Sequence, residues 1–137
     1  MSLEHLKNRP PLPPLEHGKL TEWHWVVYHP QNLKLSNDTD IGCFTSIHAQ
    51  NGIEIEDYVQ IGSHCTIYSI STISTTDEPV GGKVTIKKGA CIGSHSTVFP
   101  GVTIGEGAII GAHSLVTKDI PPHCVAFGVP AKVVRQL

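Results

Sequence analysis

The chain is short of charge. Asp, Glu, Lys and Arg make up only 16% of its 137 residues, and the formal net charge is -2. Because no basic patch is present, nucleic acid and anionic membrane surfaces are not expected partners. A charge content this low also indicates that part of the protein surface is buried against copies of the same chain.

The lack of a membrane-spanning run and of a secretory signal bears on where the protein is expected in the cell. No apolar run reaches the length of a membrane span, and no secretory signal pattern opens the chain. The four cysteines include no CxxC pair, so we expect reduced thiols at core or corner positions rather than a disulfide framework. These are Cys43, Cys65, Cys91 and Cys124. The prediction is a cytoplasmic protein that does not insert into a membrane.

What the chain has in abundance is a six-residue repeat between residues 84 and 116. A branched aliphatic residue opens each six: Ile86, Ile92, Val98, Ile104, Ile110 and Val116. A small or branched residue follows four places on: Ala90, Ser96, Val102, Ala108 and Ser114. A fixed period of six is typical of a parallel β-helix, in which three sixes make one triangular coil. Both sets should point inward and stack at about 4.8 Å per coil, because no single coil can bury its own face.

The repeat also runs back to Leu35 or Ile41, with two interruptions. The phase slips at Asn51 and Gly52, a pair that favours a tight turn. Residues 71–82 are polar and out of phase, so they should leave the coil as a loop. With that loop at a corner, three inward columns are predicted: Ile55, Ile86, Ile104; Ile61, Ile92, Ile110; and Ile67, Val98, Val116. The same alignment stacks His64, His95 and His113 as a ladder along one outer corner, although a corner position also tolerates polar residues without any role.

Residues 1–34 should form an extended arm and a capping strand ahead of a β-helix domain at 35–137. Four prolines between positions 10 and 14 exclude a helix there. The arm is expected to lie along its own domain or a neighbouring subunit, the alternative being a ligand for a proline-binding domain. Residues 22–30 read as a strand that carries both tryptophans of the chain. Trp23 and Trp25 should plug the open end of the solenoid, or alternatively stack on a sugar.

The C-terminal part carries a more specific pattern. It contains Val116-Thr-Lys-Asp-Ile-Pro-Pro followed by Gly128-Val-Pro-Ala-Lys-Val. With the repeat before it, this closely resembles the end of the hexapeptide-repeat acyltransferases, among them the galactoside and maltose O-acetyltransferases and the N-acetyltransferases of nucleotide-linked amino sugars. The resemblance covers about residues 35–137. It implies an all-β, left-handed parallel β-helix with a C-terminal tail, assembled as a homotrimer with acetyl-CoA in the groove between neighbouring solenoids.

The resemblance also implies site residues for the cofactor. Ser94 and Ala112 would line the pantetheine through backbone groups, and Thr117 and Lys118 would lie further along it. Lys132 and Arg135 would meet the phosphates, which need cations; without the motif, a solvated C-terminal pair would be the ordinary interpretation.

The catalytic residues depart from the family's pattern. The galactoside-type enzymes use a histidine of the loop as the base, whereas residues 71–82 contain none and Thr72 falls near its position. Acetyl transfer still needs a base for the nucleophile and a donor for the oxyanion. We predict His48 as the base, with His64 as an acceptor-binding residue or alternative base, and either could instead be a structural corner residue. Asp77 and Glu78 could bind a sugar from the loop.

Three functions therefore remain open at this point. The leading hypothesis is an acetyl-CoA-dependent acetyltransferase acting on an amino or hydroxyl group of a sugar, either nucleotide-linked or part of a surface polysaccharide. The second is a γ-carbonic-anhydrase-like zinc enzyme, but the histidine ladder should diverge rather than converge on one ion, so no metal site is predicted. The third is a non-catalytic trimeric sugar-binding scaffold.

Overall fold

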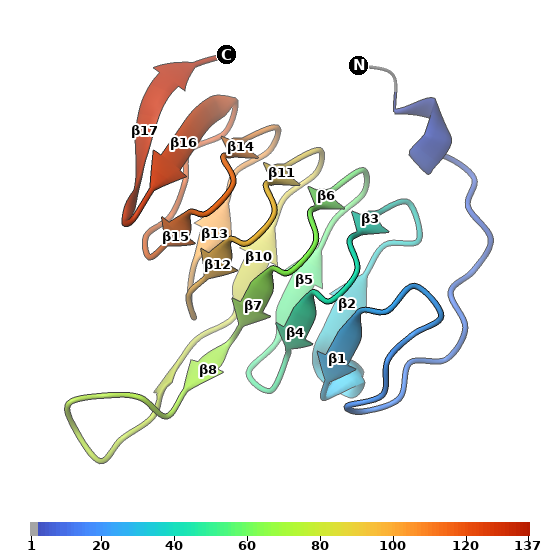
Figure 1. Ribbon diagram of the computed structural model, residues 1–137, viewed down its shortest axis with the longest axis horizontal. Coiled ribbons are helices and arrows are strands. Elements are labelled where there is room, and N and C mark those ends of the chain that lie inside the picture. Colours follow the sequence, from blue (N-terminus) through green and yellow to red (C-terminus); the bar gives the residue numbers. More distant parts are fainter. Residues whose placement is uncertain (1–2) are drawn as a thin grey trace.

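The protein is a triangular solenoid of short parallel strands, with an extended arm at its N-terminal end and a hairpin at its C-terminal end (Figure 1). The computed structural model describes residues 3–137. In Figure 1 the chain passes from the distant face over the top to the near face as the coils advance, so the coil is left-handed. No helix among these residues is long and apolar enough to span a membrane.

Three sheets form the faces of the solenoid, and their strands are parallel except for the last strand of the chain. The first face contains β2 (Leu33–Leu35), β5 (Ile53–Ile55), β10 (Val84–Ile86) and β13 (Thr103–Ile104). The second contains β3 (Asp40–Ile41), β6 (Gln60–Ile61), β11 (Cys91–Ile92), β14 (Ile109–Ile110), β16 (Cys124–Gly128) and β17 (Ala131–Gln136). The third contains β1 (Val26–Tyr28), β4 (Ser46–His48), β7 (Thr66–Tyr68), β12 (Thr97–Val98) and β15 (Leu115–Val116).

The predicted inward columns are confirmed by the strand register. Ile55 pairs with Ile86 and Ile86 with Ile104 on the first face, and the predicted members of the other two columns pair in the same way. All of these side chains are buried, as are the small residues four places on in each six. The buried hydroxyls of Ser96 and Ser114 both donate to the carbonyl of Gly111. The few buried hydroxyls of the core are therefore satisfied by hydrogen bonds to the backbone.

Both predicted interruptions lie where the coil is broken. The amide of Gly52 donates to the carbonyl of Ala49 at 2.9 Å, and Gly52 has a φ of +97°, which closes a tight turn. Residues 71–82 leave the solenoid as predicted. The base of the excursion is an antiparallel pair, β8 (Ile70–Ser71) with β9 (Val80–Gly81), an arrangement that the sequence did not indicate.

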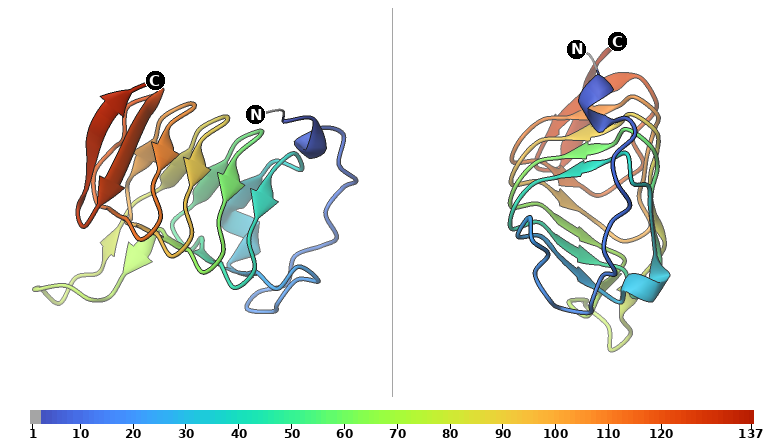
Figure 2. Two further views of the ribbon diagram at one scale, coloured as in Figure 1. Left: turned by 45° about the horizontal axis from the view of Figure 1, so that its top comes forward. Right: turned by 90° about the vertical axis from the view of Figure 1, so that its right-hand side faces the viewer.

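The N-terminal residues lie across the open end of the solenoid, as the end-on view of Figure 2 shows. The arm begins with a 3₁₀ turn, η1 (Glu4–Leu6), whose Leu6 is fully buried. Arg9 then donates a hydrogen bond to the carbonyl of Thr39, and the amide of Leu12 donates to Asn37 Oδ1 at 3.4 Å. The arm therefore lies along its own domain, one of the two placements expected.

The predicted capping strand is shorter than the sequence indicated. Only Val26–Tyr28 is extended, because His24 takes a φ of +65° and its amide closes a turn onto the carbonyl of Thr21. The 3₁₀ turn η2 (Pro30–Asn32) ends the segment. Trp25 is buried in the core, whereas Trp23 remains 44% exposed, so only one indole serves as the plug. Strand β1 already pairs with β4, so stacking begins within residues 1–34.

The C-terminal tail is a hairpin rather than an irregular segment. Strand β16 continues the second face by pairing with β14, and β17 returns antiparallel along β16. Cys124 and Ala126 of β16 close the core at this end. All four cysteines are free thiols, as predicted, with Cys65 and Cys124 buried.

Candidate functional site

Ser94 and Ala112 lie one above the other on the corner between the second and third faces. The strands before them pair in register, and the amide of His113 donates to the carbonyl of Ser94 at 3.0 Å. A Cβ atom added to Gly93 would lie 2.5 Å from the amide nitrogen of Ala112. The two coils therefore approach so closely that this corner presents backbone and very small side chains to the outside.

The close approach of Gly93 to the backbone of Ala112 leads to a prediction about stability. Gly93→Ala would drive a methyl group into backbone that cannot rotate away, so we expect the free energy of unfolding to fall by about 1–3 kcal/mol. Urea denaturation measures the change. Gly89→Asn is the control, because Gly89 has a φ of +72°, which Asn tolerates, and a Cβ atom added there would meet no other atom within 4 Å. Equal stability of the two variants would contradict the close approach.

The histidine ladder is confirmed and is longer than predicted. The imidazole rings of His64 and His95 stack with centroids 4.7 Å apart, and those of His95 and His113 with centroids 4.9 Å apart. Phe44 and His24 extend the column towards the N-terminal end. All five residues have φ between +57° and +65°. The repeated corner conformation therefore sets the ring spacing.

The stacked rings do not converge on one point. The interplanar angles along the ladder are 4° and 7°, so the ring nitrogens run side by side rather than towards a shared centre. Among residues 3–137, no three His, Cys, Asp or Glu side chains are grouped so that they could hold a metal ion.

His48 lies on the outer surface of the third face, at the end of β4. Its ring stacks on Tyr28 with centroids 4.7 Å apart, and its Nε2 lies 3.3 Å from Ser46 Oγ. The carbonyl of His48 accepts hydrogen bonds from the amide and the hydroxyl of Ser69. Ser69 directly precedes β8, so His48 lies beside the point where the loop leaves the coil. Partial burial lowers the pKa of His48, which keeps its imidazole neutral and basic near pH 7.

The two predicted catalytic histidines lie apart. His48 is in register with Tyr68, whereas His64 lies four residues before Tyr68, at the opposite edge of the third face. At strand geometry that separation is about 13 Å. Of the two, His48 is the one beside the loop, and His64 belongs to the ladder and lies one coil before Ser94.

Two tyrosines beside His48 were missed by the sequence reasoning. The register places Tyr28 and Tyr68 on either side of His48 on the same outer row, and Phe99 continues the row against Tyr68. Burial raises the pKa of Tyr68, so its phenol keeps its proton and can donate a hydrogen bond. The available signal was that Tyr28 and Tyr68 each lie 20 residues from His48. A regular coil of three sixes has 18 residues, so the spacing matches one coil only if the phase break lengthens it.

The basic residues divide between two places. Strand β17 pairs Lys132 with Phe127, and Phe127 packs where a side chain on Gly111 would lie. Lys132 therefore continues the row of Gly93 and Gly111, one residue away from the row of Ser94 and Ala112. Arg135 is exposed on the same strand. Thr117 and Lys118 follow β15, at the opposite edge of the third face from Ala112. One protomer therefore brings Ser94, Ala112 and Lys132 together but not Lys118.

The loop acids are exposed. Asp77 and Glu78 lie between β8 and β9, where the carbonyl of Glu78 accepts the hydroxyl of Ser74. Their carboxylates are open to solvent, and Thr72 lies at the start of the same excursion.

No family model matches the chain. Among curated proteins, it is 43% identical over 95 residues to the galactoside O-acetyltransferase of Escherichia coli (strain K12), covering 61% of this chain and 47% of the relative. It is 34% identical over 131 residues to the galactoside O-acetyltransferase of Lactococcus lactis subsp. lactis (strain IL1403), covering 88% of this chain and 55% of the relative. The chain thus spans about half the length of these curated relatives.

Solved structures give the same result for the fold. A galactoside acetyltransferase in complex with coenzyme A superposes with a TM-score of 0.74 and 29% identity, covering 89% of this chain and 64% of that one. AntD, an N-acyltransferase from Bacillus cereus in complex with dTDP and 3-hydroxybutyryl-CoA, superposes with a TM-score of 0.69 and 26% identity, covering 82% and 77%. The chain belongs to the hexapeptide-repeat acyltransferase superfamily.

The outer row on the third face carries the candidate catalytic groups. The loop that leaves beside His48 contains no histidine, and the imidazole that stands next to it comes from the solenoid itself. The arrangement provides one neutral base, one protonated phenol and a small-residue corner. The first two are groups that an acyl transfer uses, namely a base for the proton of the nucleophile and a donor for the oxyanion.

Proposed function

We propose that this protein transfers the acetyl group of acetyl-CoA to an amino or hydroxyl group of a sugar. The observation that carries the proposal is that Ser94, Ala112 and Lys132, three residues that the resemblance assigns to the cofactor, lie within one residue of the same register row. The named activities of the relatives support it, as do the CoA-bound structures that share the fold. Cytoplasmic location and a role in surface-polysaccharide synthesis belong to this proposal.

The chemistry assigned to the site is a single displacement. His48 takes the proton of the acceptor as its nitrogen or oxygen attacks the thioester carbonyl carbon. The carbon–sulfur bond then breaks, and the proton passes to the departing sulfur. Tyr68 donates a hydrogen bond to the acceptor or to the developing oxyanion. Since a neutral amine is the stronger nucleophile, the absence of a loop histidine favours N-acetylation.

A homotrimer is part of the proposal. In one protomer His48 and Ser94 lie at opposite edges of the third face, at least about 13 Å apart by strand geometry. A seam between copies can set the His48 edge of one solenoid against the Ser94 corner of the next. Sedimentation equilibrium should give three times the protomer mass of 14.8 kDa, and a monomer with full activity would exclude a shared site.

The decisive experiment is a substrate screen. Purified protein is mixed with acetyl-CoA and a panel of amino sugars, galactosides and sugar nucleotides, and free thiol is read with a disulfide reagent. Thiol release that requires one acceptor establishes the activity. CoA binding without turnover on any acceptor would favour a non-catalytic scaffold, and the lack of CoA binding at millimolar ligand would end the acyltransferase proposal.

A charge prediction follows for the cofactor. Arg135→Ala removes a cation proposed to meet the CoA phosphates, and such charge-assisted bonds contribute enough that we expect about tenfold weaker binding by calorimetry. Lys132→Ala should behave in the same way. Lys87→Ala is the matched control, because Lys87 is an exposed cation that is not among the residues proposed to bind the cofactor. Equal losses for Lys87→Ala and Arg135→Ala would indicate a nonspecific charge effect.

The pH profile gives an independent prediction for the base. Because burial lowers the pKa of His48 below the ordinary value of about 6.5, its basic form persists to lower pH. The acidic limb of kcat/KM should therefore have its midpoint below about 6.5, measured between about pH 5 and 8. A midpoint above about 6.5, or an unchanged limb in His48→Gln, would assign the base elsewhere.

A further inference from the structure

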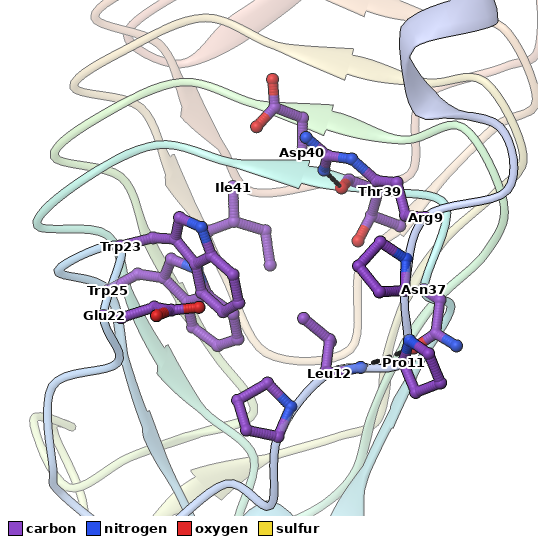
Figure 3. Close-up of a pocket in the computed structure, with 12 residues that line it drawn as sticks. Arg9, Pro11, Leu12, Glu22, Trp23, Trp25, Asn37, Thr39, Asp40 and Ile41 are labelled. Carbon is purple, nitrogen blue, oxygen red and sulfur yellow. Dashed lines mark hydrogen bonds between the residues drawn. The ribbon is translucent and has the colours of Figure 1, made fainter.

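A cavity of about 310 Å³ lies at the N-terminal end of the solenoid, away from the proposed acetyl-transfer residues. Figure 3 shows the indoles of Trp23 and Trp25 along one side of it, with the prolines of the arm opposite and Leu12 entering between them. Ile41 lies at the inner end. The cavity therefore lies between the two indoles and the extended N-terminal arm, and the side chains of neither fill it.

The polar groups around this cavity are mixed in character. Glu22 and Asp40 place carboxylates on its rim, and no hydrogen bond or ion pair from residues 3–137 reaches either carboxylate. Arg9 contributes a guanidinium of which one nitrogen is bonded to the carbonyl of Thr39. Asn37 uses its Oδ1 for the amide of Leu12, which leaves its amide nitrogen available. The site therefore offers both acceptors and donors.

We infer that this cavity is a binding site for a saccharide ring, separate from the acetyl-transfer site. A sugar ring presents an apolar face of C–H groups, which suits an exposed indole such as that of Trp23, and an edge of hydroxyls that need donors and acceptors together. The cavity is at the small end of the range for ligand sites, about 300–1,000 Å³, so it accommodates about one ring rather than a nucleotide. A simple cation fits less well, because it would use the two carboxylates but leave the donors of Arg9 and Asn37 without a partner.

The position of the site suits a sugar polymer. It lies at the opposite end of the solenoid from Lys132 and Arg135 of β17 (Figure 1). A ring held at this end would anchor a longer saccharide whose other units extend along the solenoid. Binding here does not depend on acetyl-CoA, so the inference stands independently of the proposed activity.

The test uses intrinsic fluorescence, since both tryptophans of the chain line the cavity. The full chain is titrated without acetyl-CoA, using methyl β-galactoside and N-acetylglucosamine as probes. Sorbitol serves as the ring-free polyol and tetramethylammonium as the cation. We expect a saturable change with at least one of the two sugars and none with sorbitol or tetramethylammonium. No saturable change up to about 50 mM of either sugar, or saturation by tetramethylammonium alone, would overturn the inference.

Variants assign the binding to this cavity. By calorimetry, Trp23→Ala should weaken sugar binding about fivefold or more, because the stacking surface is lost. Glu22→Gln should weaken it several-fold, whereas Glu106→Gln, a matched exposed carboxylate at the other end of the solenoid, should not. Leu12→Trp fills the cavity without touching the core and should abolish binding. Sugar binding retained by Leu12→Trp would place the ligand elsewhere.

One readout separates this site from the transfer site. Trp23→Ala should keep its turnover on a small acceptor identified by the substrate screen, because Trp23 lies outside the third-face row of His48. If Trp23→Ala loses both turnover and sugar binding, the cavity is the acceptor site itself, and the inference of a separate site is contradicted.

Discussion

His48→Ala should lower kcat by about 10²- to 10⁴-fold, the contribution that a positioned general base usually makes. The side chain lies on the outer surface of the third face and is not part of the core cluster, so the solenoid should fold normally. CoA affinity should change little, because the role proposed for His48 is to take the proton of the acceptor rather than to bind the cofactor. Single-turnover acetyl transfer, together with CoA binding by calorimetry, measures both quantities.

Two further variants test the assignment of His48: His64→Ala tests the alternative base, and His5→Ala is the control. His64 is the alternative base, and its position on the ladder one coil before Ser94 predicts a smaller loss that affects KM more than kcat. His5 is exposed in the N-terminal turn η1, far from the third face, and its removal should leave turnover unchanged. A large loss of kcat in His64→Ala with full activity in His48→Ala would reverse the assignment.

Ile110→Ala should destabilise the protein by about 2–5 kcal/mol. Ile110 is only 1% exposed and stacks between Ile92 and Ala126 in the inward column of the second face. Removing three carbons leaves a cavity that two coils share, and stacked coils cannot close it without shifting their backbone hydrogen bonds. Urea denaturation at one fixed protein concentration measures the loss, because assembly would make stability depend on concentration.

The residue directly before it provides the control. Ile109 belongs to the same strand but points outward and is 39% exposed, so Ile109→Ala should change the free energy of unfolding by about 1 kcal/mol or less. The two substitutions are chemically identical and differ only in direction. Equal effects would mean that the inward and outward sides of β14 have been misassigned, and with them the whole six-residue register.

For the arm and the capping segment, local sequence patterns predicted the backbone conformation only in part and did not predict the contacts with the solenoid. Four prolines predicted an extended chain, and the chain is extended. The positions of Leu6 and Arg9 against the solenoid depend on groups far away in the sequence, such as the carbonyl of Thr39. Similarly, the aromatic run at 22–30 predicted a longer strand. His24 instead has the positive φ that recurs at the corresponding corner of each later coil, so the chain turns there.

The six-residue period was enough to predict the solenoid, its three inward columns, the loop at 71–82 and the histidine ladder. A side chain that recurs every six residues must return to the same position in each coil, so these features follow from the order of the residues. The folded chain was needed to show that Tyr28 and Tyr68 flank His48, that His48 and His64 lie at opposite edges of one face, and that Trp23 and the arm enclose a cavity. These relations join different coils or the two sides of a coil end, and their distances depend on how the chain closes around the core rather than on its period.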